Sequence, residues 1–448
     1  MASAAEQLAS SVNFGALAKA TELKKRIWFT LGALIVYRLG TYIPLPGIDA
    51  QAISDVFQQN SSGILGMFDM FAGGALSRMT IFALNIMPYI SASIIIQLMT
   101  TVSSHLATLK KEGETGRKKI IQYTRYGTVF LAAIQGLGIA TGLESVTSSS
   151  GPAVIDPGVF FKFTTVVTLT GGTIFLMWLG EQITARGIGN GISLIIMAGI
   201  VANLPIALVS TLELGKTGAL SGIFILIILI MSVLVIGFIV FIERAQRRVL
   251  IQYPKRQVGM KMFGGESSHL PLKLNTAGVI PPIFASSILL LPVTAMSFNA
   301  GSGGPGWLMD VTALLGRGQP LYMALYISAI VFFAFFYTSI VFSPADTADN
   351  LKKNGGFIPG IRPGENTAVY IDYVLTRLTV VGAAYLSAIC ILPEILISKY
   401  AVPFYFGGTS LLIVVNVTMD TVAQIHSHLI AQQYEGLIKK SKLRGRGL

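Results

Sequence analysis

Residues 221–242 read SGIFILIILIMSVLVIGFIVFI, and no charged side chain interrupts this stretch. An apolar run of about 18 residues or more is typical of a helix that crosses a membrane, since about 20 helical residues span the hydrocarbon core. Backbone groups in lipid must be paired within the segment, and barrel strands would alternate apolar and polar positions. The stretch therefore predicts a transmembrane helix.

Further apolar stretches of similar length lie on both sides of this one. The chain of 448 residues is 52% hydrophobic and 12% charged, whereas a soluble domain carries roughly 25% charged residues. We therefore expect an all-α membrane protein with ten transmembrane helices, at about 27–44, 79–101, 124–143, 161–180, 191–212, 221–242, 276–296, 320–343, 374–393 and 404–430.

The basic residues predict the orientation of these helices. Lys24, Lys25 and Arg26 precede the first stretch, which favours an uncleaved span with the N-terminus in the cytoplasm. With this start, 27 of the 33 Lys and Arg residues fall on the cytoplasmic side, and the six exceptions are Arg38, Arg78, Lys162, Lys216, Arg317 and Lys399. The asymmetry predicts an even number of spans and cytoplasmic termini, and much of the net charge of +12 lies in the cytoplasmic loops.

An internal similarity suggests two halves. Residues 86–96 (IMPYISASIII) and 280–290 (IPPIFASSILL) share four identities in eleven when Pro88 is aligned with Pro282. Each segment lies in the second span of a five-span half, so the halves have opposite topology, as in inverted-repeat membrane proteins. We expect a cytoplasmic N-terminus at 1–26, halves at 27–213 and 214–431, and a basic cytoplasmic tail at 432–448.

Residues 63–77 (GILGMFDMFAGGALS) are apolar, rich in Gly and Met, and too short to span a membrane. Two interpretations remain, an extracellular loop helix or a re-entrant half-helix. Short Gly-interrupted segments often accompany a transport pathway, which favours the re-entrant helix.

Side chains that could carry chemistry are scarce. No nucleotide-binding motif is present, the single cysteine is Cys390, and the four histidines do not have the spacing of a metal site, so no cofactor or metal is expected. The ionisable residues within the spans are chiefly Arg38 and Asp420, and the latter serves equally well as a tie between helices. This scarcity favours a passive conduit over two alternatives, a secondary transporter with buried carboxylates and a membrane-embedded enzyme.

Ile86 and Ile90 are four residues apart and share a helix face, and Ile192 and Ile196 repeat this spacing. Spacing alone favours isoleucines that face lipid. The basic loops at 243–275 and 344–373 likewise need no role beyond setting topology.

Seven motifs change these interpretations. From about residue 23 to about 440 the chain resembles the SecY family of protein-conducting channels, in the order and spacing of IPLPG (43–47), GGALSR (73–78), MPYISAS (87–93), WLGEQIT (178–184), GIGNGIS (187–193), PGIRPG (359–364) and PFYFGGTS (403–410). The resemblance implies a clamshell of two inverted halves around an hourglass pore, in a bacterial cytoplasmic membrane. It also implies passage of unfolded secretory proteins and lateral release of membrane segments.

The resemblance assigns two sets of residues to the pore. The pore constriction would consist of six ring isoleucines, Ile86, Ile90, Ile192, Ile196, Ile283 and Ile413. A ring of apolar side chains dewets when empty and offers no fixed hydrogen bonds to a passing chain. The re-entrant segment would be the plug, with Gly63, Ile64, Met67, Phe68, Met70 and Phe71.

The resemblance also gives the repeated segments and the basic loops a function. A lateral gate would use small side chains that allow close helix approach, at Ser91, Ser93, Ser286 and Ser287. The basic loops would bind the motor ATPase SecA or a translating ribosome through Arg248, Lys255, Arg256 and Arg362. The other implied partners are the small subunits SecE and SecG, signal sequences and unfolded precursors.

Overall fold

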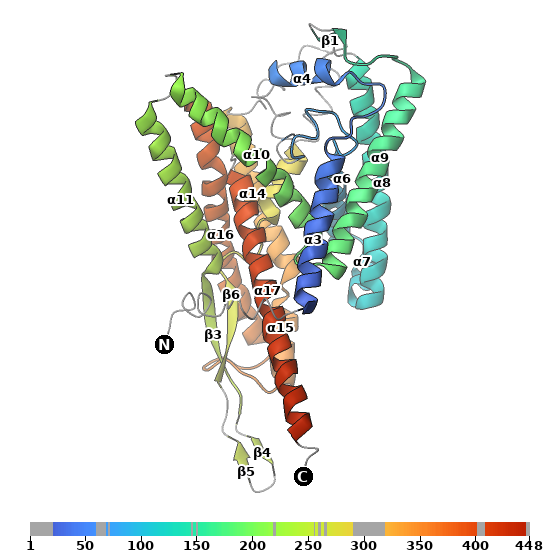
Figure 1. The fold of residues 1–448 in the computed structure, drawn as a ribbon. Helices are drawn as coiled ribbons and strands as arrows, with labels where there is room; N and C mark the ends of the chain where they lie inside the picture. The colour runs from blue at the N-terminus through green and yellow to red at the C-terminus, as the bar shows by residue number, and fades with distance from the viewer. Residues whose placement is uncertain are drawn as a thin grey trace. The chain divides into compact units, whose positions relative to one another are not determined.

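The computed structural model describes residues 21–59, 69, 72–144, 147–148, 151–217, 221–254, 256–258, 261–263, 267–289, 319–400 and 408–444. These residues are mostly helical, with three small two-stranded sheets (Figure 1). They form two compact units. The first comprises the described residues of Met1–Ile206 and Val417–Leu448, and the second those of Ala207–Pro292 and Val311–Asn416.

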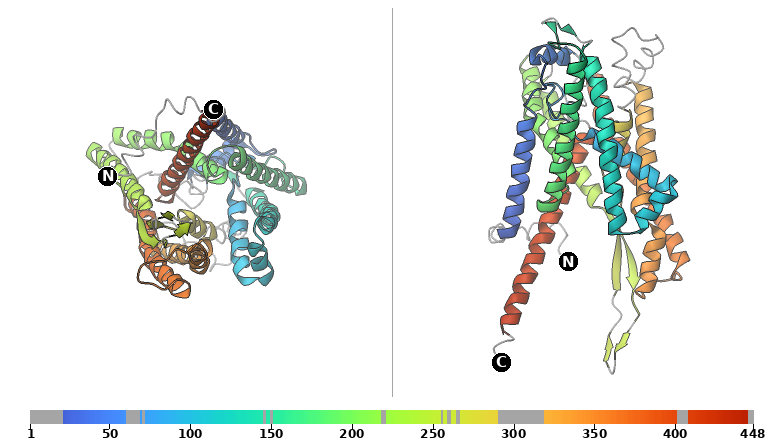
Figure 2. Two further views of the ribbon diagram at one scale, coloured as in Figure 1. Left: turned by 90° about the horizontal axis from the view of Figure 1, so that it is seen from below. Right: turned by 90° about the vertical axis from the view of Figure 1, so that its right-hand side faces the viewer.

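The first unit is built around long helices. Its elements are α3 (Thr21–Gly40), α4 (Ala50–Gln59), α6 (Met87–Val102), α7 (Ser104–Lys111), α8 (Glu114–Glu144), α9 (Val159–Arg186), the start of α10 (Gly191–Lys216) and the end of α17 (Gly408–Arg444), with the strand pair β1 (Thr147–Ser148) and β2 (Gly151–Pro152). Helices α8 and α9 run side by side (Figures 1 and 2). The buried face of α8 repeats small residues at every fourth position, namely Thr124, Thr128, Ala132, Gly136 and Ala140, which lets neighbouring helices approach closely.

The second unit combines helices with a long hairpin. It contains α11 (Gly222–Arg244), the antiparallel pair β3 (Gln246–Gln252) and β6 (Ser267–Lys273), the outer pair β4 (Arg256–Val258) and β5 (Lys261–Phe263), a short helix Ile280–Leu289, α14 (Pro320–Val341), α15 (Pro344–Lys353), α16 (Glu365–Tyr400) and the start of α17. Gln246 pairs with Lys273 and Gln252 with Ser267, and the hairpin extends from the end of α11 (Figure 1). The Ser221 hydroxyl caps α11 by accepting a hydrogen bond from the Phe224 amide at 3.3 Å.

Each of the ten predicted stretches contains a described helix, but fewer helices satisfy the length and composition of a membrane span. Among the described residues, seven do so, or eight if α6 and α7, bent by 98°, count as one span. Helix α3 carries Lys24, Lys25, Arg26 and Arg38 in 20 residues, and the description of the Ile280–Leu289 helix stops at 289. The all-α membrane fold is therefore confirmed, whereas the count of ten spans stays a prediction.

The expected helix at 79–101 begins only at Met87. Residues 79–86 form turns, with positive φ at Met79 (44°) and Asn85 (49°). Their backbone pairs with the chain that follows α3, because the Ile81 amide donates to the Ile43 carbonyl at 3.0 Å. These backbone groups are paired without a helix, and the stretch is buried irregular backbone.

Candidate functional site

The first pair of ring isoleucines lies at the start of α6. Ile86 is the N-cap residue, and its carbonyl accepts a hydrogen bond from the Ile90 amide at 3.1 Å. Both side chains are buried, with exposed fractions of 1% and 8%. Pro88 lies in the first helical turn, where its missing amide proton costs nothing. The two isoleucines therefore sit one turn apart on a helix with a well-defined start.

The second pair lies at the start of α10. Ile196 is 7% exposed and Ile192 is half-buried, one turn before it. Close packing with α9 positions this turn, since a Cβ atom at Gly191 would overlap the Gly180 carbonyl oxygen. Only glycine allows the two helices to approach so closely here.

The turn at 187–191 is held by side chains from distant helices. The Ile188 amide donates to the Thr30 hydroxyl of α3 at 3.1 Å, and the Gly189 amide donates to Oε1 of Gln424 on α17 at 2.9 Å. Gly189 has φ of +86°, a conformation that glycine adopts readily. Helices α3 and α17 thus fix the entry into α10, and with it the positions of Ile192 and Ile196.

The other two ring isoleucines belong to the second unit. Ile283 lies in the Ile280–Leu289 helix, and Ile413 is 2% exposed on the first part of α17. Four of the six are therefore placed in one unit and two in the other. Their assembly into a single constriction stays a prediction.

The gate serines are buried or half-buried on two helices. Ser91 is 5% exposed on α6, and the Ser93 hydroxyl accepts a hydrogen bond from the Gln97 side chain at 3.5 Å. In the second unit, the hydroxyls of Ser286 and Ser287 both donate to the Ile283 carbonyl, at 2.9 and 2.8 Å. Bonding within their own helix lets such small polar residues lie in an apolar environment at low cost.

The plug residues Gly63, Ile64, Met67, Phe68, Met70 and Phe71 lie outside the described residues. The described part of this stretch is anchored. The Asp69 carboxylate accepts a hydrogen bond from the Ser77 amide at 2.7 Å. The backbone carbonyl of Asp69 accepts one from the Gly74 amide at 2.9 Å. Burial raises the pKa of the Asp69 carboxyl, and the hydrogen bonds with Ser77 oppose that rise.

Arg38, predicted as an ionisable residue within a span, contacts the same stretch. Its Nη1 donates to the Gly73 carbonyl at 2.9 Å. Arg38 and Arg78 both lie over the ring of Tyr42, with guanidinium carbons 5.5 and 4.3 Å from the ring centre. The arginines thus hold the end of the 63–77 stretch against the end of α3.

The two basic loops pack together into one body, which we call the docking module (residues 246–252, 267–273 and 344–375). Gln252 and Phe357 form a β-bridge, with N–O distances of 2.9 and 3.0 Å. A shared apolar core joins the hairpin to the second loop and α16, and consists of Val249, Leu272, Ile358, Ile371, Val374 and Leu375. Figure 2 shows the hairpin beside α15.

Two of the predicted docking residues lie exposed on this module. Arg248 projects from β3 opposite Pro271. Arg362 lies in a turn between Gly360 and Gly364, whose φ angles are +83° and +109°. The Thr367 hydroxyl donates to the Arg362 carbonyl at 2.9 Å and so fastens that turn.

The side chains of the other two docking residues are not described. Lys255 lies outside the described residues, and Arg256 is described for its backbone alone, in β4. The sequence also did not indicate that the two loops would meet, because the Gln252–Phe357 bridge joins residues far apart in the chain.

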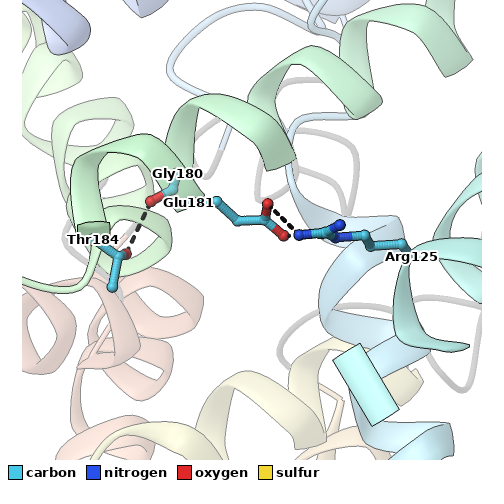
Figure 3. A network of polar contacts seen from close by, with 4 residues as sticks. All are labelled: Arg125, Gly180, Glu181 and Thr184. Atoms are coloured by element: carbon cyan, nitrogen blue, oxygen red, sulfur yellow. Dashed lines mark hydrogen bonds and ion pairs between the residues drawn. The ribbon is translucent and has the colours of Figure 1, made fainter. Parts of the chain in front are cut away.

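An ion pair that the sequence did not predict connects α8 to α9. Arg125 and Glu181 form two parallel hydrogen bonds, Nε to Oε1 at 2.9 Å and Nη2 to Oε2 at 2.6 Å (Figure 3). Their side chains are 46% and 28% exposed. The Thr184 hydroxyl of the same helix donates to the Gly180 carbonyl at 2.9 Å and accepts a hydrogen bond from the Gly191 amide. The network therefore connects the ion pair's helix to the start of α10.

No group of three or more His, Cys, Asp or Glu side chains that could hold a metal ion occurs among the described residues. The site as described consists of apolar faces, helix-bonded hydroxyls and an exposed basic module. Such groups can line and gate a passage and bind an acidic partner.

Comparisons with known proteins give the same picture. The family model SecY matches residues 80–422. The protein translocase subunit SecY of Escherichia coli strain K12 is 57% identical over 426 residues, which cover 95% of this chain and 96% of the relative. Among solved structures, one described as a protein-conducting channel has a TM-score of 0.66 at 18% identity, covering 90% of this chain and 92% of its own. A channel chain from a canine ribosome–channel complex has a TM-score of 0.63 at 18% identity, with the same coverage of both chains.

At 18% identity, the likeness to these solved structures shows the fold alone. The family match covers more than half of the chain, and the bacterial relative is similar over almost all of it. This chain therefore belongs to the SecY family.

Proposed function

We propose that this chain is the central, channel-forming subunit of a bacterial protein translocase. It provides a passage for unfolded secretory proteins across the cytoplasmic membrane and a lateral exit for apolar segments into the lipid. The observation that carries this proposal is the 57% identity to a protein translocase subunit over 95% of the chain. A secondary transporter for a small solute is not favoured.

The channel is passive in this proposal. The sequence has no nucleotide-binding motif. Energy therefore comes from partners, namely SecA with ATP or a translating ribosome, while SecE and SecG complete the complex. The exposed arginines of the docking module support a contact with acidic or phosphate-bearing partners.

Residue roles follow from the same proposal. The ring isoleucines seal the passage, the 63–77 stretch closes it, and the serines on α6 and on the Ile280–Leu289 helix line the gate. Burial of Ile86, Ile90, Ile196 and Ile413 supports a dry, tightly packed constriction. The excess of basic residues supports cytoplasmic termini and a cytoplasmic docking module.

Reconstitution tests the proposal. The purified complex is placed in lipid vesicles with a secretory precursor, and the fraction of precursor protected from added protease is measured. We expect protection only when both SecA and ATP are present, and none in vesicles that lack the complex. Protection without ATP or without SecA would contradict a passive conduit, and no protection under any condition would contradict the proposed function.

A further inference from the structure

We call the β3–β6 strand pair the docking hairpin and the helix Ile280–Leu289 the gate helix. The connection between them is short and largely buried. Strand β6 ends at Lys273, and the helix Ile280–Leu289 begins seven residues later. Asn275 lies in this connection and is 5% exposed. A buried amide has strong hydrogen-bonding requirements, so its partners determine how this connection is held.

The Asn275 side chain both donates and accepts hydrogen bonds. Its Nδ2 donates to Oε1 of Glu243, at the end of α11, at 2.7 Å, and to the Gly278 carbonyl at 3.1 Å. Its Oδ1 accepts a hydrogen bond from the Gly278 amide at 3.1 Å. One side chain thus joins the end of α11 to the turn that immediately precedes the gate helix.

The base of the hairpin is bound to the same place. The Leu274 amide donates to the Ala245 carbonyl at 3.0 Å, directly after α11. Helix α16 covers the connection, since a Cβ atom at Gly382 would lie 3.0 Å from the Leu274 carbonyl oxygen and 3.6 Å from the Asn275 Cα. The connection therefore has little freedom to move without α11 and the hairpin.

The gate helix also packs against α14. Phe284 makes edge-on contacts with Phe333 and Tyr337 of α14, with ring centres 5.7 and 6.2 Å apart. Ile283, Ser286 and Ser287 follow Gly278 within the next nine residues. A substitution at Asn275 that loosens this connection would therefore first change the positions of the predicted gate and ring residues of this unit.

We propose that Asn275, paired with Glu243, is a positioning residue that fastens the start of the gate helix to the base of the docking hairpin and so sets how readily the gate opens. This inference rests on the proposed translocation function. Weakening the pair lowers the cost of moving the gate helix, so signal sequences that bind poorly become sufficient to open the gate.

A polarity exchange tests the pair within the complete reconstituted complex. Asn275→Asp places a carboxylate against Glu243 and removes the donor. Glu243→Gln keeps an acceptor oxygen for Asn275 and is the matched control. The double variant restores a hydrogen bond in the reverse direction, because the new amide at 243 can donate to the new carboxylate at 275. The readout is the ratio of translocation of a precursor with a defective signal sequence to that of the intact precursor.

For Asn275→Asp we expect this ratio to rise roughly three- to tenfold, the factor that corresponds to the net contribution of about one hydrogen bond. Glu243→Gln should stay near the wild-type ratio, and the double variant should return toward it. SecA binding to the complex should not change in any variant, since the exposed face of the hairpin is unaltered.

Two results would overturn the inference. One is an unchanged ratio in Asn275→Asp complex that still transports the intact precursor. The other is a double variant whose ratio equals that of Asn275→Asp, because a general loss of packing would not be rescued by reversing a hydrogen bond. If Asn275→Asp does not assemble, the comparison of Glu243→Ala with Glu243→Gln decides, and equal ratios would reject the pair. Failure of the wild-type complex to transport the intact precursor would instead reject the proposed function itself.

Discussion

Isoleucine suits a constriction that must both close and open. Its β-branched side chain is bulky near the backbone and has no hydrogen-bonding group that could hold a passing polypeptide. Ile90 and Ile196 have nearly all of their surface covered, which excludes water from the faces that carry them. Burying such a side chain contributes about 1.5–3 kcal/mol, so a packed set of them seals without any specific bond.

Replacing Ile196 by glycine should therefore open a leak. The loss of the side chain leaves space that water and ions can enter, and we expect a clear rise in the resting ion conductance of the reconstituted complex. The matched control is Ile206→Gly, on the same helix but 58% exposed, which carries the same helix-propensity cost of roughly 0.5 kcal/mol. Equal conductance of the two variants would argue against Ile196 as part of the seal.

At the scale of the element, hydropathy located the helices well, because lipid requires long apolar helices wherever the chain crosses. It failed at residues 79–86, which are as apolar as a span but form turns. Two of their backbone hydrogen bonds join residues 43–45, for example the bond from the Leu45 amide to the Met79 carbonyl at 3.0 Å. Hydropathy averaged over a short window cannot detect pairing with a segment more than 30 residues away in the chain.

The same limit applies to the candidate site. Motif resemblance assigned roles to residues that stay predictions, and it did not indicate that Gln252 and Phe357 would bridge or that Asn275 would contact Glu243. The Arg125–Glu181 pair likewise joins two helices whose approach depends on small residues along α8. These contacts arise from tertiary packing, which local patterns do not encode.

The irregular segment 79–86 packs so closely against α9 that one methyl group added at Gly172 would disturb the contact. A Cβ atom at Gly172 would overlap the Ile81 carbonyl oxygen, whereas one at the neighbouring Gly171 would meet no atom within 4 Å. We expect Gly172→Ala to destabilise the complex by about 1–3 kcal/mol through overpacking. Gly171→Ala should be neutral or stabilising by up to about 1 kcal/mol, because alanine favours the helix. Thermal unfolding of the purified complexes measures the difference, and identical midpoints would contradict the close approach.

At the scale of the whole molecule, the dominant feature is the distribution of charge. With the flanking residues included, 27 of the 33 basic residues fall on the side predicted to be cytoplasmic and six on the side predicted to be outside. Setting topology needs only this excess and does not require that two loops share an apolar core. The packing of Val249 and Leu272 against Ile358 and Ile371 instead makes the docking module a defined surface. A rigid surface loses less entropy on binding than two independent loops would.

Reversing one charge on this surface should therefore impair partner-driven transport without unfolding the chain. Arg362 is exposed in a turn fastened by Thr367, so Arg362→Glu removes no buried contact. We expect SecA-dependent translocation to fall roughly 10- to 100-fold, as loss of a hydrogen bond to a charged group costs about 1.5–3 kcal/mol. Lys216→Glu, an equal charge change at an exposed residue predicted to lie outside, is the control and should keep its activity. SecA binding and precursor protection at several salt concentrations measure the effect, and the deficit should narrow as salt screens the contact. Full activity of Arg362→Glu, or equal loss in both variants, would remove Arg362 from the docking surface.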